Sequence, residues 1–295
     1  MKLRVQARAK INWSLDIVGT LPNGYHDLDM LMQSVTLCDQ MRFEDAEGLS
    51  LSMRMKGSRY LPADERNLVL RAARALQEAT GCRKGARISL AKYIPVAAGM
   101  GGGSSDAAAT LVALNRMWGT GLTDTELEKI GVTIGSDVPF CVCGGLQRAQ
   151  GVGDRLTRLP MRRELYLAAF QPCRGLSTKE VFSRIGGEGE ESSRPDNVSG
   201  MEALRTGNVK RLSAALGNVL EPVACEMRPA IREAIDALLA EGAAGARMTG
   251  SGSAVFGVFE NAALCRRAVD ALAGRYHDCR MMRTAREGVV ITRLD

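Results

Sequence analysis

The stretch at residues 95–108, PVAAGMGGGSSDAA, decides the fold, and four of its residues are glycine. It follows a β-forming run at residues 86–94 and leads into an alanine-rich helical pattern at residues 104–119. Glycine lets backbone amides approach a ligand closely. A helix N-terminus adds free N–H groups and the positive end of the helix dipole. The order of strand, glycine loop and helix therefore predicts a phosphate-binding loop, although glycines that only permit tight packing would give the same pattern.

Two common phosphate loops do not fit this stretch. A P-loop requires Gly-Lys followed by Ser or Thr, and the chain contains no Gly-Lys pair. A dinucleotide-binding fingerprint requires a third glycine where this sequence has Ser104. The loop must therefore belong to another class of phosphate-binding protein.

The composition is that of a globular protein with room for a large core. The chain has 295 residues, of which 45% are hydrophobic and 24% charged, and this length favours two domains. Aromatic residues make up only 4%, and the net charge of +6 comes from dispersed lysines and arginines. This balance suits a small anionic ligand better than a dedicated nucleic-acid surface.

The sequence gives no sign of a membrane span, a signal peptide or a metal site. No apolar run is long enough to cross a bilayer, and the N-terminus lacks an apolar signal core. The eight cysteines are dispersed, and the two histidines, His26 and His277, lie far apart. We therefore expect reduced thiols, no zinc site and a cytoplasmic location.

Alternating and periodic apolar residues predict the other elements. Pro22, Asn23 and Gly24 predict a turn. Helices are expected at 67–81, 123–135, 229–242 and 261–274, and a hairpin within 144–160. Strands are expected at 2–10, 11–19, 32–37, 49–55, 163–172, 252–260 and 288–294.

The pattern divides the chain into two predicted domains, residues 1–155 and residues 156–295. The polar segment at residues 186–197, GGEGEESSRPDN, is expected to be a mobile surface loop. Predicted strands and helices follow one another without an internal repeat.

Three motifs in order resemble those of the GHMP kinases, the family named for galactokinase, homoserine kinase, mevalonate kinase and phosphomevalonate kinase. Residues 7–19 resemble the first motif, residues 95–108 the second and residues 248–259 the third. The resemblance implies an α+β fold with a ribosomal S5 domain 2-like N-terminal domain and a ferredoxin-like C-terminal domain, with ATP and substrate meeting between them. Each part is expected to contribute to one cleft.

Further fragments resemble one branch of this family. They are residues 9–17 (AKINWSLDI), 23–39 (NGYHDLDMLMQSVTLCD) and 136–145 (SDVPFCVCGG). That branch transfers phosphate from ATP to the 2-hydroxyl of 4-diphosphocytidyl-2-C-methyl-D-erythritol, in the non-mevalonate isoprenoid pathway. The resemblance therefore implies a small-molecule kinase with an alcohol acceptor.

Lys10 and Asp137 are the candidate catalytic residues. Spacing alone favours a role for Asp137, before Pro139, in stabilising a helix end or a turn, and Lys10 could extend its ammonium into solvent. By resemblance, Asp137 accepts the substrate proton, and Lys10 pairs with it and with the acceptor hydroxyl. An adjacent ammonium would keep the carboxylate ionised. Whether the proton moves early or late stays open, because a loose transition state needs little base strength.

The candidate substrate contacts follow the same resemblance. Tyr25 offers a ring for stacking on a pyrimidine and His26 a polar edge, although Gly-Tyr-His could form an ordinary turn. Thr178 and Phe182 lie four residues apart and would share one face of a helix, where Phe182 could instead be core. The full substrate set comprises Asn12, Tyr25, His26, Thr178 and Phe182.

The resemblance also assigns the ATP site. Asn67 and Lys92 are possible nucleotide contacts, and Gly250 and Gly252 are expected to line the cleft from the other domain. Mg²⁺ is expected to bridge the phosphates near the Ser104 and Ser105 hydroxyls, but its ligands stay open. The cofactor-binding set comprises Pro95, Val96, Ala97, Ala98, Gly99, Met100, Gly101, Gly102, Gly103, Ser104 and Ser105.

Three other functions compete with this one. A GHMP kinase could act on homoserine or a mevalonate derivative, a non-catalytic protein could use the same fold to bind a ligand, and the positive charge could serve RNA. The sequence favours a small-molecule substrate and ATP, with no nucleic-acid or membrane partner. It leaves the oligomeric state open.

Overall fold

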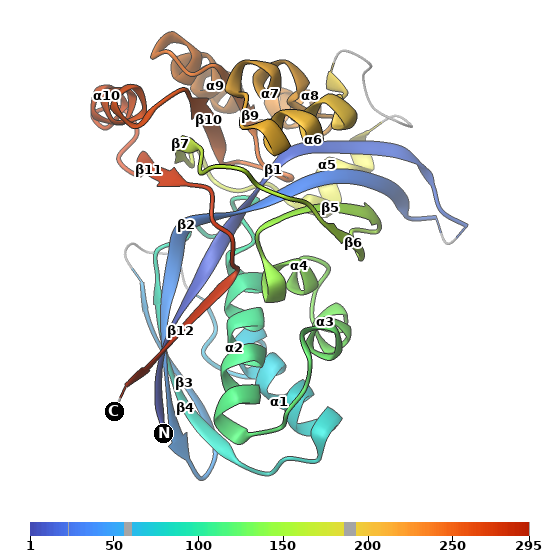
Figure 1. Ribbon diagram of the computed structural model, residues 1–295, viewed down its shortest axis with the longest axis vertical. Coiled ribbons are helices and arrows are strands. Elements are labelled where there is room, and N and C mark those ends of the chain that lie inside the picture. Colours follow the sequence, from blue (N-terminus) through green and yellow to red (C-terminus); the bar gives the residue numbers. More distant parts are fainter. Residues whose placement is uncertain (23, 56–60, 186–192, 295) are drawn as a thin grey trace.

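The computed structural model describes residues 1–22, 24–55, 61–185 and 193–294 (Figure 1). Asn23 of the predicted turn lies outside these residues, as does most of the predicted mobile loop at residues 186–197. Two sheets organise the described chain, one of eight strands and one of four.

Two very long strands form the centre of the eight-stranded sheet. Strand β1 runs from Lys2 to Thr20 and pairs antiparallel with β2, His26–Ala46. The two strands predicted at residues 2–10 and 11–19 are therefore one strand, and β2 extends far beyond its predicted limits. Three register shifts, the first between Arg8 and Lys10, bend the pair without ending it.

The remaining strands complete the eight-stranded sheet in the order β12-β1-β2-β4-β3, with β5 beside β2, β6 beside β5 and β8 beside β1. Strand β12, from the end of the chain, thus returns to the sheet formed by its beginning. These strands are β3 (Leu49–Met55), β4 (Gly85–Lys92), β5 (Leu146–Gly151), β6 (Arg155–Arg158), β8 (Gly217–Asn218) and β12 (Val289–Leu294).

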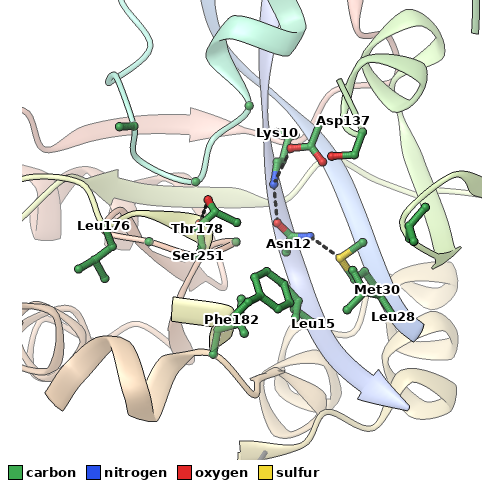
Figure 2. Close-up of a pocket in the computed structure, with 18 residues that line it drawn as sticks. Lys10, Asn12, Leu15, Leu28, Met30, Asp137, Leu176, Thr178, Phe182 and Ser251 are labelled. Atoms are coloured by element: carbon green, nitrogen blue, oxygen red, sulfur yellow. Dashed lines mark hydrogen bonds and ion pairs between the residues drawn. The ribbon is translucent and has the colours of Figure 1, made fainter. Parts of the chain in front are cut away.

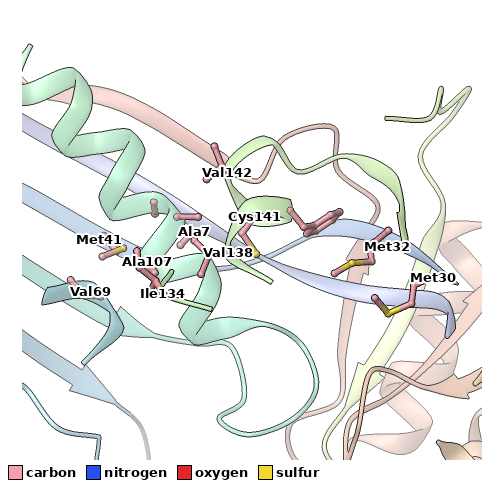
Figure 3. Packing of buried hydrophobic residues seen from close by; sticks show 14 of the residues in the cluster. Ala7, Met30, Met32, Met41, Val69, Ala107, Ile134, Val138, Cys141 and Val142 are labelled. Atoms are coloured by element: carbon pink, nitrogen blue, oxygen red, sulfur yellow. The ribbon is translucent and has the colours of Figure 1, made fainter. Parts of the chain in front are cut away.

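Four helices lie on one side of this sheet (Figure 1). They are α1 (Leu68–Thr80), α2 (Gly102–Trp118), α3 (Asp124–Val132) and α4 (Val138–Cys143). The alanines of α2 are fully buried and allow close approach to the sheet, where Ala107 packs near Ala7 and Val138 (Figure 3). As predicted, α1 stops at left-handed Gly81, and a capping box at Thr123 starts α3.

The smaller sheet has the strand order β11-β7-β10-β9. Its strands are β7 (Tyr166–Phe170), β9 (Gly245–Met248), β10 (Val255–Phe259) and β11 (Arg280–Arg283). Helices separate β7 from β9 and β10 from β11, which gives the ferredoxin-like order of strands and helices. The predicted α+β fold class is confirmed.

Six more helices of the described residues accompany the smaller sheet, and the sequence predicted only some of them. Helices α9 and α10 confirm the predictions at residues 229–242 and 261–274. The helix implied for Thr178 and Phe182 is α5, whereas α6, α7 and α8 were not predicted. The six are α5 (Thr178–Arg184), α6 (Asn197–Thr206), α7 (Val209–Ala215), α8 (Glu221–Met227), α9 (Ala230–Ala240) and α10 (Ala262–Leu272).

The division into residues 1–155 and 156–295 stays a prediction. It falls inside β6, which still pairs with β5 in the larger sheet, and β12 also belongs to that sheet. All eight cysteines lie among the described residues and are free thiols. No described helix is long and apolar enough to cross a membrane.

Candidate active site

The glycine stretch connects β4 to α2, as predicted, but the helix begins two residues earlier than expected. Gly101 is the N-cap with φ +69°, and Gly102 is the first helical residue. The predicted start at Ser104 is therefore wrong, because Gly101 turns the chain and the carbonyl of Gly101 already accepts from the Ser105 N–H at 2.8 Å. The amides of Gly102, Gly103 and Ser104 thus form the open end of the helix.

Both ends of the chain hold this loop in place. The Lys10 N–H of β1 donates to the Met100 carbonyl at 3.0 Å, and the Ala254 N–H donates to the Ala98 carbonyl at 3.0 Å. The Thr249 hydroxyl donates to the Gly99 carbonyl at 3.4 Å. The two glycine loops predicted from sequence, around Gly99 and Gly250, are therefore in direct contact.

Gly99 should not tolerate a side chain. Its φ is +78°, and an added Cβ would lie 2.1 Å from the backbone carbonyl oxygen of Thr249. We expect Gly99→Ala to shift the loop and lower kcat/KM for ATP by about 10²-fold. Its matched control is Gly119→Ala, at a position with a similar left-handed φ (+70°) and no atom within 4 Å of the added Cβ. Steady-state kinetics showing equal losses in both variants would contradict this account.

Lys10 and Asp137 are brought together, although they come from β1 and from the start of α4. The Lys10 Nζ lies 3.4 Å from the Asp137 Oδ2 and donates to the Asn12 Oδ1 at 2.7 Å (Figure 2). Lys10 is buried, whereas the Asp137 side chain is one-third exposed. Asp137 makes no side-chain capping bond to α4, so its carboxylate is available to the adjoining cavity.

A cavity of about 280 Å³ adjoins this pair (Figure 2). Gly99 and Gly101 line it from one loop, and Gly250 to Gly252 line it from the other. The Thr178 and Ser251 hydroxyls lie 2.8 Å apart at its edge. Its remaining lining is Lys10, Asn12, Leu15, Leu28, Met30, Ala97, Ser136, Asp137, Val152, Leu176, Phe182 and Leu220.

The predicted substrate residues are partly assembled. Asn12, Thr178 and Phe182 line the cavity, whereas Tyr25 and His26 do not. The His26 ring instead stacks on Phe182, with ring centroids 5.3 Å apart and planes inclined by 28°. The His26 Nδ1 is buried without a hydrogen-bond partner among the described residues. Tyr25 is 66% exposed.

A second pocket, of about 160 Å³, lies on the α1 side of the glycine loop. It brings together Asn67, Lys92, Pro95 and Val96 with the first residues of α2. Asn67 also has a structural role, because its Oδ1 accepts from the Val69 N–H at 2.9 Å and caps α1. The two nucleotide-side candidates therefore share one pocket with the open helix end.

Sequence reasoning missed the buried charge cluster beside this pocket. The Lys92 ammonium donates to Asp39 and, at 2.6 Å, to Asp106. Asp39 is fully buried and also accepts from the Tyr93 and Ile94 N–H groups. Asp39 and Lys92 both occupy positions where their strands otherwise place apolar residues such as Met41. A charged residue at a core-facing position of each strand was the available signal.

Asp106 is the protonatable member of the cluster. Burial raises its pKa well above the ordinary value, against the attraction of Lys92, and its Oδ1 has no partner among the described atoms. The unfolded chain loses this proton above pH about 4, while the folded chain keeps it up to the raised pKa. We therefore expect the stability of the natural chain to fall, relative to Asp106→Asn, as pH rises from about 4. Parallel urea-unfolding profiles of the two proteins across pH would contradict this assignment.

The magnesium expectation can be tested against the side chains present. The Ser105 hydroxyl donates to the Arg8 carbonyl at 2.7 Å and is buried, so it faces the fold. Ser104, in the first turn of α2, remains the candidate neighbour. The described residues contain no group of three His, Cys, Asp or Glu side chains able to hold a metal. The site therefore fits an ion carried mainly by phosphate oxygens and water, as Mg²⁺ commonly is.

The fold and the two glycine loops in contact define a class of protein, and comparison with known proteins gives its name. A family model for the GHMP kinases N terminal domain matches residues 67–145, and one for the GHMP kinases C terminal matches residues 201–278. The chain belongs to the GHMP kinases. It is a small-molecule kinase, and its family implies ATP as the phosphate donor.

Several relatives share one name. A 4-diphosphocytidyl-2-C-methyl-D-erythritol kinase of Pelotomaculum thermopropionicum is 42% identical over 99% of this chain and 98% of the relative. The kinase of that name from Brevibacillus brevis is 38% identical over 99% of this chain and 100% of the relative.

Solved structures agree with the fold. A crystal structure of 4-(cytidine 5'-diphospho)-2C-methyl-D-erythritol kinase matches with a TM-score of 0.79 and 32% identity, over 95% of this chain and 98% of that one. Homoserine kinase from Cytophaga hutchinsonii also has a TM-score of 0.79, over 99% of this chain and 97% of that one. Its identity is only 19%, so that likeness shows the fold alone.

Proposed function

We propose that this kinase transfers the γ-phosphoryl group of ATP to the 2-hydroxyl of 4-diphosphocytidyl-2-C-methyl-D-erythritol. The observation that carries the proposal is the Lys10–Asp137 pair, 3.4 Å apart, beside a cavity lined by both glycine loops. Two relatives that match this chain along almost its whole length are named as kinases of this substrate.

The pair supplies the acceptor side of the reaction. The acceptor hydroxyl would lie between the Asp137 carboxylate and the Lys10 ammonium. Asp137 accepts its proton, and Lys10 stabilises the negative charge that develops on the oxygen. Asn12 holds Lys10 through the 2.7 Å hydrogen bond and so fixes the ammonium toward the cavity.

The glycine loop supplies the donor side. The amides at the open end of α2 point to where phosphate oxygens would bind, and the helix dipole favours their negative charge. Mg²⁺, when bound with ATP, would neutralise phosphate charge, with Ser104 as its nearest side-chain candidate. Asn67 and Lys92 would contact the nucleoside side from the second pocket.

The rings of His26 and Phe182 are the candidate cytosine contacts. In the described structure they stack on each other, so a base can enter between them only if they separate. Thr178 lies one turn before Phe182 and would contact the polar part of the substrate, while the exposed Tyr25 ring offers a further stacking surface.

Removing one of these two rings should weaken binding of the cytidyl substrate but not of ATP. We expect Phe182→Ala to raise KM for the cytidyl substrate by about fivefold, because an aromatic pair contributes about 1 kcal/mol beyond its buried area. KM for ATP serves as the internal control and should stay unchanged. Equal changes in both constants, or none in either, would remove Phe182 from the cytosine site.

The test of the acceptor is a direct comparison. Phosphorylation of the cytidyl substrate, homoserine and mevalonate should be measured at equal enzyme and ATP concentrations, as kcat/KM. The proposal predicts a clear preference for the cytidyl substrate. A preference for homoserine or mevalonate would leave the chain a kinase but show that the proposed substrate is wrong.

The remaining expectations stay predictions. A cytoplasmic location and the lack of a nucleic-acid or membrane partner rest on the sequence alone, and the oligomeric state stays open. A non-catalytic role is disfavoured, because Lys10, Asp137 and both glycine loops are all in place.

A further inference from the structure

The side of the larger sheet opposite α1–α4 carries a basic hollow. Figure 1 shows these four helices on one side of the sheet, and no described helix lies on the other side of β3 and β4. There, a hollow of about 510 Å³ opens to solvent. Its polar lining includes Arg4, Arg42, Arg54, Gln40, Ser52 and Tyr93.

The strand register explains the hollow. Arg4 of β1 lies opposite Arg42 of β2, Arg42 opposite Ser89 of β4, and Ser89 opposite Ser52 of β3. In the next row, Ala91 separates Gln40 from Arg54. The small side chains of β4 therefore form a floor between arginines on either side.

The charges on this face are arranged against the stability of the sheet. Arg4 and Arg42 are directly opposed, and like charges in that position are destabilising. Their neighbours Lys2 and Arg87 both pair with Glu44, at 3.4 and 3.7 Å. Within the described ranges, Arg4, Arg42 and Arg54 form no ion pair. The opposed arginines break the rule against pairing like charges across strands, and no acidic side chain among the described residues compensates for them. Such an arrangement indicates that a bound anion supplies the missing negative charge.

We propose that this hollow binds a small anion with two or more phosphate groups. Guanidinium groups match phosphate oxygens in a two-pronged geometry. The Ser52 hydroxyl donates to the Ser89 hydroxyl at 3.1 Å, which leaves the Ser89 and Tyr93 hydroxyls to donate to the same phosphate oxygens. Tyr93 is the only aromatic residue lining the hollow in the described chain, whereas single-stranded nucleic acid is bound by successive aromatic platforms. The binding is independent of the kinase reaction proposed above.

This hollow is separate from the catalytic cavity. Residues alternate along β4, so Ala91 faces the hollow while Lys92 faces the opposite pocket beside the glycine loop. A phosphate probe could occupy the glycine loop as well, so that site must first be filled. Calorimetry with inorganic tripolyphosphate should use the whole chain saturated with a non-hydrolysable ATP analogue, without free magnesium. One further equivalent of tripolyphosphate is expected to bind, more weakly as salt is raised.

Three variants assign that binding to the hollow. Arg42→Gln and Arg54→Gln, on opposite walls, should each weaken it about tenfold, the loss expected for one charged hydrogen bond. Arg87→Gln, on the same face but paired with Glu44, should leave it unchanged. The unfolding midpoint of Arg42→Gln should equal or exceed that of the natural chain, because its repulsion with Arg4 is removed. If Arg42 instead stabilised the fold, its replacement would lower the unfolding midpoint.

Three results would overturn the proposal. They are a lack of tripolyphosphate binding when the nucleotide site is filled, equal binding in the natural chain and both wall variants, and tighter binding of a single-stranded oligoribonucleotide than of tripolyphosphate. The last would make this face a nucleic-acid surface instead.

Discussion

Asp137→Asn is expected to lower kcat by about 10²–10⁴-fold, the usual contribution of a positioned general base. Asparagine keeps the shape of the side chain but cannot accept the acceptor proton, and it leaves the buried Lys10 ammonium without its carboxylate partner at 3.4 Å. Early proton transfer would place the loss at the upper end of this range and late transfer at the lower end, because a loose transition state needs little base strength. KM for ATP should change by less than about threefold, because the glycine loop does not depend on Asp137.

The matched control is Asp278→Asn, an exposed aspartate that pairs with Arg280. It should leave both constants unchanged. If Asp137→Asn retained most of its turnover, positioning by Lys10 and the loops would suffice, and Asp137 would not be a catalytic base.

Lys92→Met is expected to lower the free energy of unfolding by about 3–5 kcal/mol, because it leaves the buried Asp39 and Asp106 carboxyl groups without their cation. Asp39 has its other oxygen fixed by two backbone N–H groups, so it cannot turn toward solvent. Urea unfolding at neutral pH measures the loss directly.

Two further variants bracket this result. The exposed Lys129→Met should lie within about 0.5 kcal/mol of the natural chain. Asp106→Asn should not lower the free energy of unfolding at neutral pH, because Asp106 is the carboxyl whose pKa is raised. Lys92 also retains its ion pair with Asp39 in this variant. A Lys92→Met protein as stable as its Lys129 counterpart would show that the cluster is not a stabilising unit.

The family resemblance predicted the fold class, and local patterns located many of its elements but not the lengths of the strands. Alternation in β1, both ends of α1 and the start of α3 follow from nearby residues, so they could be predicted directly. The register shifts that carry β1 past residue 10 depend on pairing with β2, which is a tertiary contact. The pairing of β12 with β1 also depends on the whole fold, because the sequence of residues 288–294 does not indicate which strand it pairs with.

The site was predicted in the same uneven way. Motif resemblance located Lys10, Asp137 and both loops, and the structure places them around one cavity. Asp39 was missed, because its partners lie more than fifty residues away and become neighbours only across β2 and β4. The helix start was misplaced because Ser104, Ser105 and Asp106 are good capping residues, whereas the turn is made by left-handed Gly101.

The most direct test of the central claim is phosphorus NMR of the product formed from ATP and 4-diphosphocytidyl-2-C-methyl-D-erythritol by the natural chain and by Asp137→Asn. The account predicts a new phosphomonoester on the 2-hydroxyl with the natural chain, and almost none with the variant over the same time. No such product from a folded protein that binds ATP, or a phosphate on another position, would contradict it.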